Sequence, residues 1–393
     1  MKIKIHKGAQ QIGGSIVEIS TNSARIIIDF GADLPSNENM NNNIEIEGVT
    51  VGKRNCDAIL LSHYHGDHIG LVYKALPDIP VYIGCTAKKI QKALVERISR
   101  ENISTVNRFN TFKTLDKLIF KDICVTPFFI DHSAFDAYMF LIEVENLNIL
   151  YTGDFRTHGF RGSKTIPMLK SYIGTVDYLI TEGTLLTRDN DKIMSENELQ
   201  QGARKIMKKY KYVFVLSSST NIDRIGAFYH ANPKGRLFIC DSYQKKILSI
   251  VKDNHRDNSK FYDFKYVYSY GPNLNKKMNK NGFCMLIRQG KYFKQFLERY
   301  KDNSIIIYSM WSGYLDNENA KNEELIKFLE PYSYTKLHTS GHATKQDLKE
   351  VIETVKPRKG IIPIHTENQD GFDYICGNFN VIKLEDNEFI EFK

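Results

Sequence analysis

His63-Tyr64-His65-Gly66-Asp67-His68 places four side chains able to bind a metal within six residues. The apolar run Ala58-Ile59-Leu60-Leu61 leads into it and predicts a buried strand. Ile69-Gly70-Leu71-Val72-Tyr73 follows, and we expect a helix there. A strand that ends in a His- and Asp-rich loop can aim several ligands at one point, and imidazoles with a carboxylate suit zinc, manganese or iron. The alternative, a polar loop with clustered histidines, requires this spacing to arise by chance.

Length and composition fit a globular protein with more than one core. The chain has 393 residues, so we expect two domains or one interrupted domain. Hydrophobic residues make up 42% and charged residues 25% of the chain, which is ordinary for a soluble globular protein. The net charge of +8 suits a polyanionic partner, although a generally solvated Lys-rich surface explains it as well.

The cysteines indicate a reducing compartment. They are scattered along the chain without a Cys-x-x-Cys pair, which argues against a disulfide framework. The N-terminus alternates like a strand and lacks the apolar core of a signal peptide. No apolar run approaches the roughly 18 residues of a membrane span. We therefore expect a cytoplasmic protein.

Further candidate ligands follow other predicted strands in the first half of the chain. Three short strands are expected within residues 1–30, and the third ends at Asp29, which either supports the metal site from behind its ligands or forms a turn. Later strands end in Asp131-His132-Ser133, Gly153-Asp154-Phe155 and Glu182-Gly183-Thr184. Strands that share a sheet put such ends along one edge, so these side chains are expected to converge.

Two capping boxes predict the starts of later helices. Ser195 with Glu198, and Thr344 with Asp347, have the spacing at which a side chain and a backbone N–H satisfy each other reciprocally. Between these helices, strands and helices alternate to about Leu329, which predicts a parallel, doubly wound sheet. Residues 253–282 are polar and give no assignment.

Further candidate metal ligands occur near the C-terminus. His338-Thr339-Ser340-Gly341-His342 precedes the second of these helices, and a predicted strand at Gly360–Ile364 ends at His365. The simplest organisation is an insertion. Residues 1–185 and 333–393 then form a metal-binding α/β domain, which an α/β domain at residues 186–332 interrupts.

The order of these motifs resembles the metallo-β-lactamase fold, and the insertion resembles its β-CASP branch, which includes ribonuclease J-like RNA-processing exonucleases. The resemblance covers essentially the whole chain, although ribonuclease J usually carries a further C-terminal domain. It implies an αββα sandwich with an inserted, doubly wound parallel sheet, and it leaves the oligomeric state open. The residues that carry it are Asp29, the His63–His68 stretch, His132, Asp154, Glu182, His342 and His365.

The resemblance implies two divalent metals, zinc most often and manganese in some members. His63, His65 and His132 would hold the first metal. Asp67, His68 and His365 would hold the second, and Asp154 would bridge the two; Asp67 also counts among the catalytic residues. The ligands alone favour Zn²⁺ because nitrogen predominates.

Such a centre suits phosphodiester hydrolysis. Two metals roughly 3.5–4 Å apart clamp the attacking and leaving oxygens, and a metal-bound water with a pKa of roughly 7 makes hydroxide available. His342 is the candidate proton donor or phosphate contact, with a capping or packing histidine as the alternative. Glu182 would orient a ligand or His342, or is an ordinary acid at a strand end.

The inserted domain of the β-CASP branch closes over the metal centre and forms a cleft for a nucleic-acid strand. Single-stranded RNA is therefore the expected partner, while DNA stays open. The candidate substrate-binding residues are Ser217, Ser218, Ser219, Ser340, Gly341 and Trp311. The serines after the strand could instead only cap a helix, and Trp311 could pack in the core.

Three functions compete at this point. A metal-dependent ribonuclease leads, with endo- or exonuclease action left open. A DNA nuclease or a hydrolase of small phosphodiesters would use the same dinuclear centre. A non-catalytic RNA-binding homologue or assembly subunit is disfavoured because every expected ligand is present, and a lactamase is disfavoured because it has no use for the insertion or for Ser340-Gly341-His342.

Overall fold

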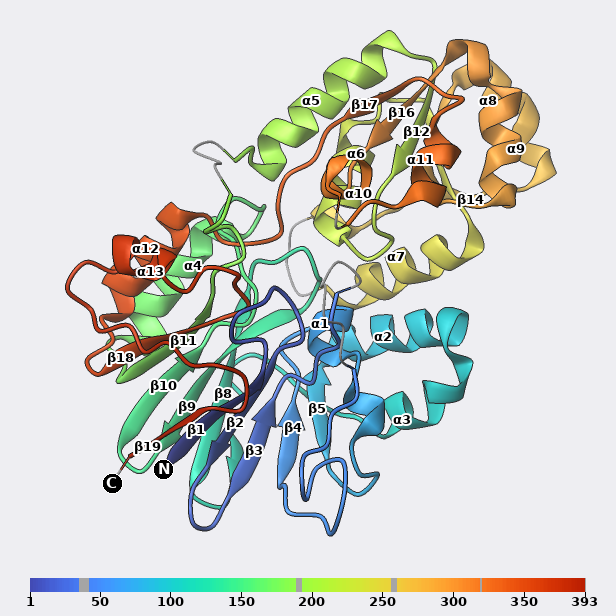
Figure 1. The fold of residues 1–393 in the computed structure, drawn as a ribbon. Helices are drawn as coiled ribbons and strands as arrows, with labels where there is room; N and C mark the ends of the chain where they lie inside the picture. The colour runs from blue at the N-terminus through green and yellow to red at the C-terminus, as the bar shows by residue number, and fades with distance from the viewer. Residues whose placement is uncertain (35–41, 189–192, 256–259, 319, 393) are drawn as a thin grey trace. The chain divides into compact units, whose positions relative to one another are not determined.

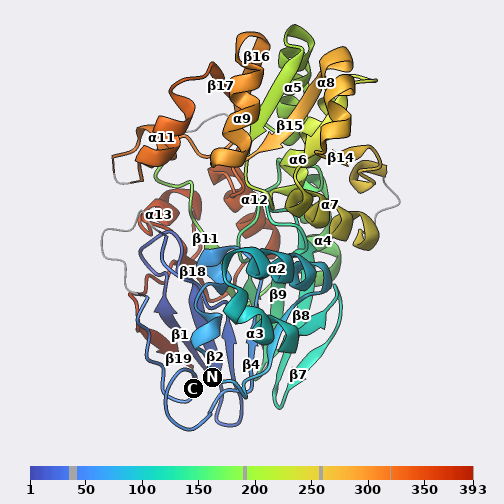
Figure 2. The ribbon, with the colours of Figure 1, turned by 90° about the vertical axis from the view of Figure 1, so that its right-hand side faces the viewer.

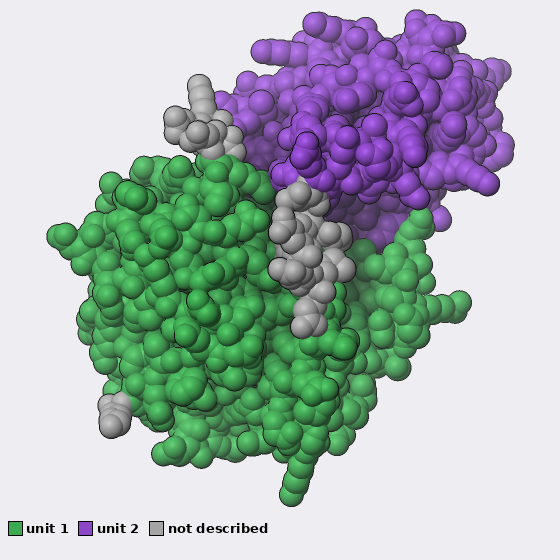
Figure 3. Space-filling view, in the orientation of Figure 1, with its two compact units in different colours: residues 1–157, 161–191, 341–393 green, residues 158–160, 192–340 purple. Residues whose placement is uncertain are grey.

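The structure is a computed structural model that describes residues 1–34, 42–188, 193–255, 260–318 and 320–392. Its Cα atoms group into two compact units, coloured in Figure 3. Unit 1 comprises residues 1–157, 161–191 and 341–393, and unit 2 comprises residues 158–160 and 192–340. The boundaries of the inserted domain, predicted at residues 186 and 332, stay a prediction. No helix among the described residues is long and apolar enough to cross a membrane.

The first sheet of unit 1 is mixed. β19, β1, β2 and β3 pair antiparallel, whereas β3 to β6 pair parallel. β1 thereby lies between β2 and β19, so that strands from near the two ends of the chain are neighbours (Figure 1). Lys2 pairs with Ser20 on one side and with Glu391 on the other. In spatial order the strands are β19 (Phe389–Glu391), β1 (Lys2–Lys7), β2 (Ile16–Ser20), β3 (Arg25–Ile28), β4 (Ala58–Leu60), β5 (Val81–Gly84) and β6 (Asn110–Phe112).

The second sheet of unit 1 is also mixed. Its β18, β11 and β10 run parallel, so their carboxyl ends lie at one edge, and the other strands pair antiparallel. In spatial order the strands are β18 (Gly360–Ile364), β11 (Tyr178–Glu182), β10 (Leu147–Tyr151), β9 (Ala137–Val144), β8 (Ile123–Ile130) and β7 (Leu118–Phe120).

The two sheets of unit 1 pack face to face between helical layers (Figures 1 and 2). Strand β9 shows why its sequence is almost wholly apolar. Its Tyr138 and Phe140 enter the core between the sheets, whereas Met139 enters a second core with helix residues such as Val351, because side chains alternate along a strand. The helices of unit 1 are α1 (Gly66–Ile69), α2 (Cys85–Ile98), α3 (Ile103–Arg108), α4 (Thr165–Met168), α12 (Lys345–Val355) and α13 (Gly371–Ile375).

Unit 2 is built on one parallel sheet, and its strand pairs are parallel throughout. In spatial order the strands are β14 (Val267–Ser269), β13 (Leu237–Cys240), β15 (Phe283–Ile287), β12 (Tyr212–Leu216), β16 (Ser304–Tyr308) and β17 (Tyr334–Lys336). The helices are α5 (Glu196–Lys209), α6 (Ile222–Ala231), α7 (Ser242–Asn254), α8 (Asn275–Asn281), α9 (Lys291–Arg299), α10 (Gly313–Asp316) and α11 (Glu323–Leu329). Apolar side chains of α8, α9 and α11 share one core with the sheet.

These layers confirm the predicted fold class, an αββα sandwich with a doubly wound parallel sheet inserted. Both predicted capping boxes are present at the starts of α5 and α12. The helix expected at Ile69–Tyr73 is present only in part, as the end of α1 at Ile69 and a separate 3-10 turn at Val72–Lys74. The helical turn α1 ends before Gly70, because the carbonyls of Asp67 and His68 accept from Ser15 and Phe30 instead of continuing the helix.

Candidate metal centre

The predicted metal ligands come together at one edge of the two sheets in unit 1. Those of the opening motif follow β4, which ends at Leu60, and the last two stand within α1. The others follow β8, β10 and β18. The residues brought together are His63, His65, Asp67, His68, His132, Asp154 and His365.

Three histidines form the first cluster. An imidazole nitrogen of each of His63, His65 and His132 lies within 4.8 Å of the others. His132 Nε2 is 3.1 Å from His65 Nδ1, and the ring centroid of His63 lies 4.6 Å from that of His132. This cluster contains the residues predicted to hold the first metal.

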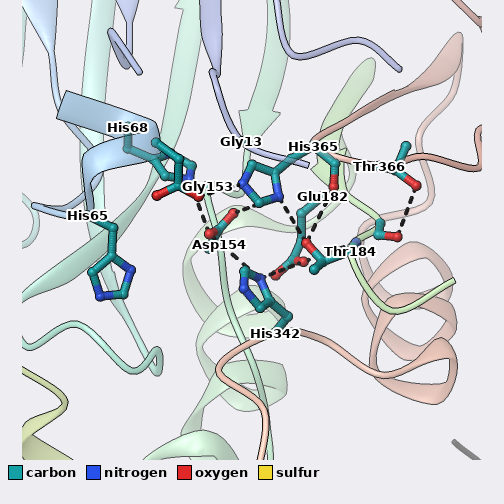
Figure 4. Close-up of polar contacts among 12 residues, drawn as sticks. Gly13, His65, His68, Gly153, Asp154, Glu182, Thr184, His342, His365 and Thr366 are labelled. Carbon is teal, nitrogen blue, oxygen red and sulfur yellow. Dashed lines mark hydrogen bonds and ion pairs between the residues drawn. The ribbon is translucent and has the colours of Figure 1, made fainter. Parts of the chain in front are cut away.

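The second cluster combines imidazoles and carboxylates, and Figure 4 shows Asp154 at its middle. His68 Nε2 lies 3.1 Å from Asp154 Oδ2, and His365 Nε2 lies 3.2 Å from Asp67 Oδ2. The same Oδ2 of Asp154 is 3.9 Å from His63 Nε2 in the first cluster. Asp154 therefore reaches both clusters, as the predicted bridging role requires.

Two buried atoms at this point test whether a metal fits. His63 Nε2 and Asp154 Oδ1 are buried and form no hydrogen bond within the described part of the chain. Leaving such groups unsatisfied costs about 1–3 kcal/mol each, so buried polar atoms are normally paired. An imidazole nitrogen and a carboxylate oxygen are both ordinary ligands of zinc, and the donor set as a whole suits that cation.

Four of the five imidazoles of the centre are oriented by a partner on Nδ1, and His65 is the exception. Such outer contacts fix the tautomer and the direction of a ligating histidine. For Nδ1 the partners are Ser62 Oγ at 3.0 Å from His63, Asp29 Oδ2 at 2.8 Å from His68, the Gly341 carbonyl at 2.7 Å from His132 and Thr184 Oγ1 at 2.9 Å from His365. The Nε2 atoms of these four histidines are thereby directed to the clusters.

Asp29 lies behind His68 and is fully buried. Its carboxylate accepts from the Ser62 backbone N–H at 2.7 Å, the Ser62 hydroxyl at 2.8 Å and the Tyr151 hydroxyl at 2.7 Å. With His68 Nδ1, the carboxylate has four hydrogen-bond partners, three on Oδ2 and one on Oδ1. The contact agrees with a supporting role for Asp29, which stays a prediction. Neither Ser62 nor Tyr151 could be singled out from a pattern of ligand residue types.

His342 and Glu182 stand beside Asp154 as a third group. His342 Nδ1 is 3.1 Å from Glu182 Oε2 and 3.6 Å from Asp154 Oδ2. The second oxygen of Glu182 accepts from the backbone N–H of Phe155 at 2.9 Å and of Ala343 at 3.4 Å. Glu182 thus links the Asp154 loop to the His342 loop.

Burial and neighbouring charge set the protonation of these groups. Burial lowers the pKa of His63 and His132 well below the ordinary value, which favours the neutral form that binds metals. Burial also lowers the pKa of His68, but the Asp154 and Asp29 carboxylates outweigh it and raise that pKa well above its usual range. A divalent cation displaces a proton held in such a site.

The pKa of His342 moves in the same direction as that of His68. Burial alone would lower it, but the carboxylates of Glu182 and Asp154 raise it to about 9. With no metal bound, this imidazole is therefore protonated at neutral pH.

An ion pair that the sequence analysis did not single out ties two ligand loops together. Arg156 Nε lies 3.3 Å from Asp131 Oδ1, and both side chains are fully buried. The Arg156 N–H also donates to the Asp131 carbonyl at 2.9 Å. Because Asp131 precedes His132 and Arg156 follows Asp154, the pair sets the spacing of the two ligands. The one sequence signal that could have pointed to this ion pair is that both residues lie close to predicted ligands in the chain.

The predicted substrate-binding residues fall in both units. Gly341, in unit 1, offers its carbonyl to His132. Ser340 and the Ser217–Ser219 loop belong to unit 2, where Ser219 Oγ lies 3.3 Å from the Tyr243 hydroxyl. Trp311, also in unit 2, is half-buried, and its ring lies edge-on to Tyr314 at 5.5 Å. Their role toward a substrate stays a prediction.

Comparison with known proteins agrees with this geometry. Residues 11–197 match the model of the metallo-beta-lactamase superfamily, and residues 334–371 match a Zn-dependent metallo-hydrolase RNA specificity domain. Ribonuclease J of Mycoplasma genitalium is 24% identical over 93% of this chain and 68% of its own length. Cleavage and polyadenylation specificity factor 73 of Drosophila melanogaster is 25% identical over 64% of this chain and 40% of its own.

A solved structure supports the fold alone. A protein of unknown function from Enterococcus faecalis aligns over 99% of both chains with a TM-score of 0.77 at 20% identity. Together with the buried His and Asp clusters, the family matches establish the class of the molecule as a metal-dependent hydrolase. Residues 11–197 carry the metallo-beta-lactamase superfamily match, and 93% of this chain aligns with ribonuclease J as a distant relative.

Proposed function

We propose that this protein is a metal-dependent ribonuclease that hydrolyses phosphodiester bonds during RNA processing or degradation. The observation that carries the proposal is the cluster of three histidines next to the His and carboxylate cluster, with Asp154 of the second 3.9 Å from His63 of the first and with His342 and Glu182 beside Asp154. Two adjoining cation sites suit the in-line displacement of a phosphodiester. The match to an RNA specificity domain and the relatives named ribonuclease J support RNA as the substrate.

The chain's own ligands divide into two sets. His63, His65 and His132 would hold one zinc ion; Asp67, His68 and His365 would hold the second, with Asp154 between them. Bound zinc would supply Lewis acidity toward a phosphoryl oxygen and a water of pKa roughly 7. The outer partners, Asp29 above all, keep the imidazoles directed at the metals, so little reorganisation is needed when substrate binds.

His342 would act on the substrate. Glu182 holds its Nδ1, so Nε2 is the nitrogen that would contact the phosphodiester or deliver a proton to the leaving oxygen. The backbone contacts of Glu182 to the Phe155 and Ala343 N–H groups keep this carboxylate in place.

Two finer features belong to the same proposal. Exonucleolytic action is supported by the likeness to ribonuclease J. A cytoplasmic location is supported by the six cysteines, which are all free thiols in the structure.

The decisive experiment compares three substrates under zinc and under manganese: labelled single-stranded RNA, DNA of the same sequence, and bis-p-nitrophenyl phosphate. We expect RNA to be cleaved fastest. If the small ester turns over while RNA stays intact, the protein is a different phosphodiesterase, and preferential cleavage of DNA would make it a DNA nuclease. Asp154→Ala and His65→Ala should each abolish hydrolysis, and retained activity in both would contradict the two-metal centre.

The mode of cleavage needs a second experiment. RNAs with a 5′-monophosphate or a 5′-hydroxyl would be digested for short times and their products sized. Mononucleotides from the first time point indicate an exonuclease, whereas intermediate fragments indicate an endonuclease. A difference in rate between the two RNAs would assign recognition of the 5′ end.

A further inference from the structure

The positive charge of the chain is concentrated in one segment of unit 2. Residues 264–301 contain nine Lys and Arg residues and a single acidic residue, Glu298. Their net charge of +8 equals that of the whole chain, so the remaining residues sum to zero. The segment runs from β14 through α8 and β15 to α9.

The cations of this segment other than Arg288 are exposed, and most form no ion pair with a described residue. Helix spacing explains their exposure, because Met278 of α8 and Phe293 and Phe296 of α9 take the positions that face the core. Arg288 pairs with Asp241, and Lys265 pairs with Asp263. The exposed lysines that form no ion pair with a described residue include Lys276, Lys277, Lys280, Lys291 and Lys294, which we call the basic face.

The two helices that carry the basic face contact each other directly. Arg299, at the end of α9, donates to Asn275 Oδ1 of α8 at 3.1 Å, and the hydroxyl of Tyr300 donates to Asn279 Oδ1 at 2.9 Å. The lysines therefore lie on two helices that these contacts and the shared core hold together.

Exposed tyrosines occur in the same segment. Tyr266 is 69% exposed, Tyr268 39% and Tyr292 44%. Exposed aromatic rings beside cations suit single-stranded nucleic acid, since bases stack on the rings while phosphates meet the lysines. No large aliphatic side chain of the segment is exposed, whereas a membrane-binding face would need such side chains to enter the bilayer. The chemistry thus favours RNA over an anionic membrane.

We propose that the basic face of unit 2 is an RNA-binding surface that holds the backbone of a single strand. The proposal deepens the ribonuclease function and rests on it for the identity of the strand. It predicts that long RNA binds more tightly than short RNA and that this gain depends on the five lysines and on salt.

The test uses a full-length variant in which Lys276, Lys277, Lys280, Lys291 and Lys294 are all changed to Gln. The matched control changes five exposed lysines of unit 1 to Gln: Lys92, Lys113, Lys164, Lys170 and Lys359. Both variants lose the same net charge, and neither change touches a core position. Binding of a 30-nucleotide RNA would be measured by fluorescence anisotropy across a range of salt concentrations, in EDTA to prevent cleavage.

We expect the basic-face variant to bind this RNA on the order of tenfold more weakly. The slope of the logarithm of the binding constant against the logarithm of the salt concentration should also be shallower, by about 0.7 for each phosphate that the substituted lysines no longer neutralise. The control variant should bind like the native chain. Hydrolysis of bis-p-nitrophenyl phosphate should be unchanged in both variants, because that ester needs only the metal centre. Equal RNA affinity of the two variants would overturn the proposal, as would lysine-dependent binding to phosphatidylserine vesicles with no lysine-dependent binding to RNA.

The two proposals fail in different ways. If the native chain cleaves RNA but the basic-face variant binds it normally, the surface is refuted and the ribonuclease stands. If the native chain binds RNA through these lysines but cleaves only DNA or the small ester, the surface stands and the ribonuclease is refuted.

Discussion

Asp29 is one buried carboxylate on which several parts of the metal centre depend. It accepts from His68 and Tyr151 and from the hydroxyl and the N–H of Ser62, and the hydroxyl of Ser62 in turn contacts His63. Loss of its charge would therefore disturb a ligand of each cluster. Its backbone also lies in the left-handed region, with φ of 57°, which Asp tolerates better than most residues.

Asp29→Asn should lower zinc affinity about 10- to 100-fold, because an amide cannot hold the Nδ1 proton of His68 as a carboxylate does. Competition with a chromophoric chelator would measure the affinity. Tyr151→Phe removes only one donor to the same carboxylate and should have a smaller effect. Equal affinity of Asp29→Asn and the native chain would show that Asp29 merely forms a turn.

His342→Ala and Glu182→Gln should keep their zinc while losing activity about 10²- to 10⁴-fold, the usual contribution of acid–base catalysis. The reason is that His342 contacts Glu182 and Asp154 without lying in either predicted ligand set. Metal analysis of each purified variant, alongside its rate on RNA, checks the expectation. A variant His342→Ala that has lost zinc would make His342 a ligand instead.

Among individual residues, the sequence pointed to candidate ligands whose residue type is distinctive. It missed residues whose role depends only on where they lie in the folded structure. His63–His68 can be recognised because few functions need so many ligands together. Ser62, Tyr151 and Thr184 are common residue types, and only the three-dimensional structure brings them to the imidazoles and their supporting carboxylate.

Among the elements, helix α12 connects the site to the core. It begins at Lys345, directly after its N-cap Thr344, and buries Leu348, Val351 and Ile352 against the second sheet. Its start is fixed by a capping box, in which Thr344 Oγ1 accepts from the Asp347 N–H at 3.0 Å and Asp347 Oδ2 accepts from the Thr344 N–H at 2.9 Å. The cap therefore sets where the His342 loop ends.

Thr344→Ala should destabilise the protein by about 1 kcal/mol, the typical cost of losing such a cap. Thermal denaturation followed by circular dichroism would measure the change. Ser195→Ala removes the matching cap of α5 in unit 2 and serves as the comparison. Loss of stability by both variants, with loss of activity only in Thr344→Ala, would support the link between α12 and His342; unchanged stability of Thr344→Ala would contradict the cap.

Most elements that the sequence did not predict are short or polar; the exception is β15, an apolar and fully buried strand that was left unassigned. β14 has three residues, and α8 has Met278 as its only large apolar residue, so neither shows a clear hydrophobic period. The long helices and the other buried strands were predicted to within a few residues, because their apolar positions repeat over several turns or pairs.

Stability of the whole molecule should depend on pH through a polar cluster on the first sheet. Burial would raise the pKa of Glu18, but hydrogen bonds from His6 and Arg25 hold it at about 2. The folded state therefore gains from ionised Glu18 above its ordinary pKa of 4.5 and loses that gain as pH falls toward 2, a contribution on the order of 3 kcal/mol. Burial also lowers the pKa of His6, so stability begins to fall below about pH 6.5.

The melting temperature should thus decrease steadily from pH 7 to pH 4 and more steeply below it. Glu18→Gln should be less stable than the native chain at pH 7 and should show a flatter acid limb. Calorimetry at a series of pH values measures both. Parallel pH curves for the variant and the native chain would contradict the role of Glu18.

The fold of the whole molecule could be predicted largely from the order of its motifs. Alternating strands and helices imply the parallel sheet, and the return of ligand residues at His365 implies an insertion. The pairing of β1 with β19 could not be predicted, because β19 is short, largely exposed and joined to β1 only across the full length of the chain.

The two ends of unit 2 meet each other. The Thr339 hydroxyl donates to the carbonyl of Met194, and buried Arg224 joins Glu196 to the Thr339 carbonyl, which it contacts at 2.8 Å. A segment whose ends already touch can be gained, lost or exchanged by recombination without stretching the protein that hosts it. Every predicted metal ligand lies in unit 1, so evolution can exchange unit 2 while the predicted metal ligands are inherited unchanged.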